Sequence, residues 1–129
     1  MIRVRDGVLA AFSMVAVLSC SGGSTGPASG LLTLELHSPN GDDGAVMFTI
    51  TGGPVDSIEA EGHAVYSAPI NSTTLRVVIT GDLQSGTLAR IRIPDRDQSA
   101  HYAGVIEQVA QRVSYIQRDP TGYEITVTQ

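Results

Sequence analysis

The chain of 129 residues has a single cysteine, no tryptophan and no lysine. A lone cysteine excludes a disulfide within the chain, so a folded domain must be stabilised by its core. Aromatic residues make up only 5% of the sequence, and the core should therefore consist mainly of Val, Ile and Leu. The 8 basic residues, all arginine, are outnumbered by 13 acidic ones. This negative balance, without a basic run, argues against nucleic acid as a partner.

Long apolar runs are also missing. The main uncharged apolar run covers residues 7–18 and follows Arg3 and Arg5. A basic start and about 7–15 apolar residues are typical of a secretory signal peptide, whereas a membrane-spanning helix needs about 18 or more. We therefore predict a signal peptide over residues 1–19, with a buried N-terminal helix as the alternative. Residues 20–30 are small and uncharged, which predicts a flexible tether before a domain at residues 31–129.

The cysteine completes the run Val17-Leu18-Ser19-Cys20, which resembles the lipobox of bacterial lipoproteins. The resemblance implies cleavage before Cys20 and acyl chains on its thiol and new α-amine, although Leu18 stands where the family usually has a small residue. Several acyl chains give a stable membrane anchor. Because Ser21 carries no inner-membrane retention charge, the resemblance favours the outer membrane. The alternative is ordinary secretion with Cys20 as a free thiol.

Residues 31–129 alternate apolar and polar side chains in short stretches that Gly, Pro, Asn and Asp separate. This pattern predicts an all-β domain, a two-sheet antiparallel β-sandwich of about seven to nine strands. The alternation directs Leu88, Arg90 and Arg92 outward. It directs these side chains inward: Leu32, Leu34, Leu36, Val46, Phe48, Ile50, Ile58, Ala60, Leu75, Val77, Ile79, Ala89, Ile91, Ile93, Tyr123, Ile125 and Val127.

One segment, residues 102–112, fits two patterns. One stripe of a helix would hold Ala103, Ile106, Ala110 and Val113. One face of a strand would instead hold Val105, Glu107, Val109 and Gln111. We expect a strand, because the neighbouring segments all alternate.

Three stretches together look like the strand pattern of cohesin-like sandwiches, which are exported modules related in shape to carbohydrate-binding modules. The stretches are residues 45–50, Gly81 with residues 85–88, and residues 91–95. They are spread over about half of the chain, cohesins are usually longer, and no dockerin-recognition motif accompanies them. The resemblance implies a sandwich fold and bears on the fold more than on the partner.

Catalytic and metal-binding patterns are absent from the sequence. It has no hydrolase Gly-x-Ser-x-Gly and no His-Glu-x-x-His, and His37, His63 and His101 lack ligand spacing. The turn at residues 40–44 is rich in Asp, but Thr51 stands where a calcium-binding EF-hand needs a glutamate. We therefore expect no catalytic residue, no metal and no cofactor, and we interpret these carboxylates as solvated turn residues. The alternative is a looser calcium site between the loops of the sandwich.

The candidate ligand-binding residues are Arg76, Arg90 and Arg92, which alternation places on the outer side of two successive strands. If those strands form a hairpin, the arginines make one patch for an acidic sugar or a partner's carboxylates. If the strands lie in different sheets, each arginine is a solvated surface residue.

The predicted function is therefore a membrane-anchored exported lipoprotein with a non-catalytic binding module, whose partner is a polysaccharide or an envelope protein. A structural envelope protein without a discrete ligand is the alternative, and a hydrolytic enzyme is the least favoured class.

The anchor is directly testable. Replacing Cys20→Ala should abolish metabolic labelling with a radioactive fatty acid and leave a larger precursor, because both acylation and cleavage require the thiol. Equal labelling of the variant and the parent would show that Cys20 is not the acylated residue.

Overall fold

The computed structural model describes residues 26–129. The predicted signal peptide, Cys20 and the first part of the tether lie outside the described residues. The described elements, in chain order, are β1 (Gly30–His37), β2 (Asp43–Thr51), β3 (Ser57–Glu59), β4 (Ala64–Asn71), β5 (Thr74–Leu83), β6 (Gly86–Ile93), the 3-10 helix η1 (Arg96–His101), β7 (Ala103–Gln111), β8 (Gln117–Arg118) and β9 (Glu124–Thr128). A search of residues 26–129 finds no helix of the length and apolar character that crossing a membrane requires.

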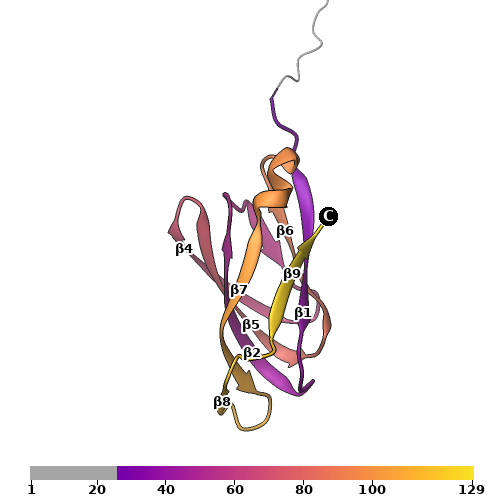
Figure 1. Ribbon diagram of the computed structural model, residues 1–129, viewed down its shortest axis with the longest axis vertical. Helices are drawn as coiled ribbons and strands as arrows, with labels where there is room; N and C mark the ends of the chain where they lie inside the picture. Colours follow the sequence, from indigo (N-terminus) through magenta and orange to yellow (C-terminus); the bar gives the residue numbers. More distant parts are fainter. Residues whose placement is uncertain (1–25) are drawn as a thin grey trace, which may run out of the picture.

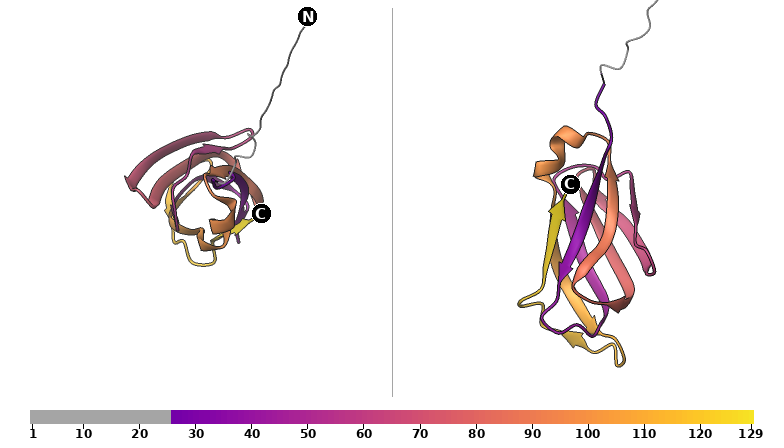
Figure 2. Two further views of the ribbon diagram at one scale, coloured as in Figure 1. Left: turned by 90° about the horizontal axis from the view of Figure 1, so that it is seen from above. Right: turned by 90° about the vertical axis from the view of Figure 1, so that its right-hand side faces the viewer.

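The strands of the described region form one antiparallel sheet in the order β3-β6-β1-β9-β7-β2-β5-β4, with β8 paired to β7. This sheet curls into a nearly closed, barrel-like shape (Figures 1 and 2). The all-β prediction is confirmed. The two separate sheets are not, because every strand belongs to one hydrogen-bonded sheet.

Along the strand order of the sheet, β7 and β9 share the fewest residue pairs. Their single pair is Gly104 with Ile125. A Cβ atom at Gly104 would lie 2.5 Å from Cγ2 of Ile125, so only glycine allows this approach. The pair joins two four-stranded halves, β3-β6-β1-β9 and β7-β2-β5-β4.

The core lies between these halves and is built from the alternating residues. Most of the predicted inward side chains are buried, and the others, among them Ile58, Leu75 and Val127, pack against the core while remaining partly exposed. Phe48 is the largest fully buried side chain. Aliphatic residues make up most of the rest, as the scarcity of aromatic residues predicts.

Leu88 does not point outward as predicted and is only 2% exposed. The pairing of β1 with β6 matches Leu34 to Ala89 and Glu35 to Thr87, so that Leu88 is the extra residue of a β-bulge. The bulge turns both Leu88 and Ala89 into the core, which simple alternation does not allow.

The segment predicted from residues 102–112 is the strand β7, as expected. A second bulge at Glu107 changes its alternation, because Met47 pairs with Gln108 and Phe48 with Ile106. Val105 is consequently 56% exposed while Val109 is 1% exposed. The prediction that these two valines share a face is wrong.

The two ends of the barrel-like sheet differ. At one end, uppermost in Figure 1, the chain enters β1 beside η1 and the C-terminus. There the Ala28 carbonyl accepts a hydrogen bond from the Arg96 amide at 2.9 Å, so part of the predicted tether is held by the domain. The loop after β1 and the short strand β8 lie at the opposite end.

The core assignment predicts unequal effects of two truncations. Ile91→Ala should lower the free energy of unfolding by about 2–5 kcal/mol, because the side chain is fully buried. Thr126→Ala, at an exposed position of β9, should change it by much less. Urea denaturation of both variants measures the difference, and equal losses would contradict the assignment.

Candidate functional site

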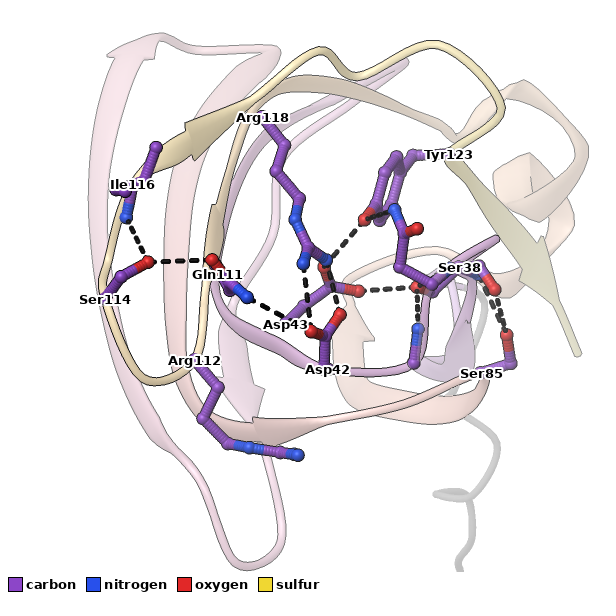
Figure 3. Close-up of polar contacts among 12 residues, drawn as sticks. Ser38, Asp42, Asp43, Ser85, Gln111, Arg112, Ser114, Ile116, Arg118 and Tyr123 are labelled. Atoms are coloured by element: carbon purple, nitrogen blue, oxygen red, sulfur yellow. Dashed lines mark hydrogen bonds and ion pairs between the residues drawn. The ribbon is translucent and has the colours of Figure 1, made fainter.

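The main polar feature of the described region is a buried carboxylate at the β8 end of the sheet. Asp43 begins β2 and is 0% exposed. It accepts hydrogen bonds from the hydroxyls of Ser38, at 2.5 Å, and Tyr123, at 2.6 Å, and from Nη1 of Arg118, at 3.1 Å (Figure 3). A buried charge is tolerated only when it is paired and hydrogen-bonded, and Asp43 meets this condition.

The neighbouring Asp42 completes the ion pair. Nη1 and Nη2 of Arg118 donate to its two carboxylate oxygens at 2.5 and 2.9 Å, a bidentate arrangement. The side-chain amide of Gln111 donates to the same carboxylate at 3.4 Å. The hydrogen bond from Arg118 lowers the pKa of Asp42 from 3.8 to about 2. In return, the hydrogen bond to Asp42 raises the pKa of Arg118.

These contacts connect loops that are distant in sequence. The Tyr123 hydroxyl accepts a hydrogen bond from the side-chain amide of Asn40 at 2.8 Å, and it donates to Asp43. The Ser38 amide donates to the Ser85 hydroxyl at 2.8 Å, which ties in the loop between β5 and β6. We call this group the Asp43 cluster, and it consists of Ser38, Asn40, Asp42, Asp43, Gln111, Arg118 and Tyr123.

The arrangement of the Asp43 cluster is typical of a structural role rather than of ligand binding. Both oxygens of Asp43 already accept hydrogen bonds from protein groups, and the carboxylate has no exposed surface for a ligand. The interpretation of the carboxylates at residues 40–44 as solvated is wrong for Asp43, which is fully buried, because Arg118 pairs with both Asp42 and Asp43. Within residues 26–129 no group of three or more His, Cys, Asp or Glu side chains is placed to hold a metal ion.

The structure separates the three predicted arginines. β5 pairs with β2 and β4, and β6 pairs with β1 and β3, so the two strands do not form a hairpin. Arg76 forms an ion pair with Glu107 at 3.1 Å. Arg90 and Arg92 remain together on β6, both exposed. The register places Arg90 beside Glu59 and Arg92 beside Ser57 of β3.

A different surface, which sequence reasoning missed, lies on the outer side of β2, β5 and β7. A hollow of about 250 Å³ is lined there by Met47, Val78, Gln108, Gln117 and Tyr115, together with neighbouring aliphatic residues. No charged residue lines it. Its walls therefore combine apolar side chains, two amides and one aromatic ring.

Tyr115 has an unusual backbone for its residue type. Its φ is 56°, and among residues 26–129 no other residue except glycine has a positive φ. The backbone amide of Tyr115 donates to the backbone carbonyl of Gln111 at 2.9 Å. The backbone amide of Gln111 donates to the backbone carbonyl of Ile116, also at 2.9 Å. The Ser114 hydroxyl donates to the Gln111 side chain at 2.8 Å. The turn thus holds Tyr115 in the left-handed region, although its side chain is 65% exposed.

The Asp42 pair predicts a pH effect. Because the folded-state pKa of Asp42 is lowered, its contribution to stability is present above its ordinary pKa of 3.8 and is lost as the pH falls toward about 2. Asp42→Asn should therefore show a smaller fall in unfolding free energy across this interval than the parent. Urea denaturation at several pH values measures it, with Glu35→Gln, which removes an exposed carboxylate outside the cluster, as the control. An identical pH profile for Asp42→Asn and the parent would contradict the coupling.

Comparisons with known proteins add no relative. No protein-family model matches the chain, and neither a curated protein nor a solved structure matches it. Function must therefore be inferred from the surfaces described above.

Proposed function

We propose that this chain is an exported, lipid-anchored protein whose β domain is a non-catalytic binding module with its ligand site at the hollow beside Tyr115. The observation that carries the proposal is the left-handed backbone of an exposed aromatic residue. Left-handed backbone costs a non-glycine residue about 1–2 kcal/mol. Since the ring of Tyr115 is mostly exposed, burial does not offset this cost, and strain of this kind is typical of functional sites.

The lining of the hollow favours a neutral sugar chain as the ligand. A pyranose ring has an apolar face that stacks on an aromatic ring and hydroxyls that hydrogen-bond to amides. Tyr115 supplies the ring, Gln108 and Gln117 supply the amides, and Met47 and Val78 supply apolar surface. Because no charged residue lines the hollow, it does not attract an ionic ligand.

A second candidate site is the pair Arg90 and Arg92, which could bind an acidic sugar or the carboxylates of an envelope protein. It is supported by the exposure of both side chains on one face of β6. Glu59 beside Arg90 weakens the attraction of that arginine for an anion. We therefore rank this pair below the hollow and assign Arg76 to its ion pair with Glu107.

The two halves of the sheet support the finer fold assignment. Because only Gly104 and Ile125 join β7 to β9, we propose that the halves act as the two faces of a cohesin-like sandwich. We further propose that acylated Cys20 holds the domain at the outer membrane. The tether would enter beside η1, which leaves the hollow and the Asp43 cluster free of the anchor. A structural envelope protein without a discrete ligand is the alternative.

The variant Tyr115→Gly separates binding from stability. Relief of the left-handed strain, about 1–2 kcal/mol, exceeds the entropic cost of glycine, about 0.5–1 kcal/mol. The free energy of unfolding should therefore rise by up to about 1 kcal/mol, whereas affinity for the sugar should fall about tenfold or more. Pull-down on cellulose, chitin and xylan, with affinity electrophoresis in soluble glucomannan, measures binding. Val113→Ala, which changes another exposed residue of the same turn, is the matched control and should bind as the parent does.

The outcomes of this experiment decide between the candidates. Equal binding by the parent and Tyr115→Gly, or no binding by the parent to any polysaccharide, contradicts the site. Binding to polygalacturonate that is lost in the double variant Arg90→Gln, Arg92→Gln would instead place the ligand on β6.

A further inference from the structure

The strand β4 ends the sheet and is unusually exposed. It pairs with β5 on one side only. Seven of its eight residues are exposed, and only Val65 packs against the core. Seen from above, the β4–β5 hairpin extends beyond the ring of the other strands (Figure 2, left). The backbone groups on the free side of β4 are therefore accessible to another strand.

Natural edge strands are commonly protected by charged side chains, prolines or bulges. β4 has no charged residue. Its protection is confined to one end, where Pro69 lies and the pairing with β5 is irregular between Pro69 and Asn71. Residues 64–68 pair regularly with β5 and carry none of these devices.

We propose that β4 pairs with β4 of a second copy of this chain, in antiparallel orientation, through residues 64–68. The twofold axis passes beside Tyr66, so that Ala64 of one copy lies opposite Ala68 of the other, and Tyr66 faces its own counterpart. Pro69 limits this register on the C-terminal side of β4. A pair centred one residue later would include Pro69, which has no amide to donate.

The chemistry of the strand favours a second copy over a partner of another kind. In a twofold pair the residue on the axis meets itself, so a charge there would be repelled by its copy. β4 meets this requirement although the chain as a whole has a net charge of −5. A partner recruited by charge would instead require charged residues on the strand.

The outer face of the sheet gives a second argument. Met47 pairs with Val78, and Val78 pairs with Tyr66, so an apolar row crosses β2 and β5 and stops at the free edge. Tyr66, at the end of the row, is 63% exposed. A second copy continues the row across the axis and covers the two Tyr66 rings, while the small side chains of Ala64 and Ala68 leave room for them.

Interface size sets the expected strength. Five paired residues and two aromatic rings bury less than the roughly 1,600 Å² of a standard interface. The dimer should consequently be concentration-dependent rather than permanent. The apolar row also lines the hollow through Met47 and Val78, so the dimer axis lies beside the proposed sugar site, although Tyr115 and β6 take no part in the pairing.

A first experiment measures association directly. The full chain is studied by sedimentation equilibrium with detergent micelles in large excess, so that two chains share a micelle only when they associate. The parent should show a monomer–dimer equilibrium, and Tyr66→Asp should raise its dissociation constant about tenfold or more. Ile70→Asp introduces the same charge at an exposed position of β4 beyond the paired segment, and it should have a much smaller effect.

A second experiment tests the register. In Tyr66→Cys the two thiols lie directly opposite across the axis, at a separation that a disulfide can span. Mild oxidation should give a covalent dimer of Tyr66→Cys but not of Ile70→Cys. The parent, oxidised in the same way, is the control for any disulfide that Cys20 forms. A parent that stays monomeric, equal dissociation constants for both aspartate variants, or equal cross-linking of both cysteine variants would each overturn the proposal. Circular dichroism confirms that every variant is folded.

Discussion

The buried carboxylate of Asp43 is the constraint on which one whole end of the domain depends. Removing a charge from water is unfavourable unless hydrogen-bond donors replace the solvent. The donors come from three separate segments, through Ser38, Arg118 and Tyr123. Because each donor comes from a different segment, the position of one segment specifies the positions of the others. Arg118 also binds Asp42 through both of its terminal nitrogens, which fixes the plane of the guanidinium group.

This fixed end supports the surface that carries the proposed function. Gln111 belongs to the Asp43 cluster through Asp42, and its backbone also closes the turn that presents Tyr115. The strained tyrosine is therefore connected to the residues of the cluster through Gln111, which donates to Asp42 and pairs with Asp43 in the β2–β7 ladder. A site built in this way is preorganised, since the cost of ordering the turn is met during folding rather than on binding.

The sequence predicts the strands and most of the core, because alternation is a local property that burial on one face imposes. It does not predict the bulges at Leu88 and Glu107, since a bulge depends on how two distant strands pair. For the same reason it leaves the hairpin of Arg76 with Arg90 open, and the structure shows that the two strands are not neighbours. The site beside Tyr115 has no sequence signal at all. Positive φ normally appears in a sequence as glycine or asparagine, and Ser114-Tyr115-Ile116 contains neither.

The position of β9 has a consequence for the order of folding. β9 follows every other strand in sequence, yet it lies near the middle of the sheet, between β1 and β7. Until residues 124–128 are in place, β1 lacks one of its two neighbours and the two halves are not joined. The final closure therefore connects β1 with a strand almost one domain length away, and such non-local closure is slow because loop entropy must be lost first. The domain therefore cannot complete its core until residues 124–128 are available.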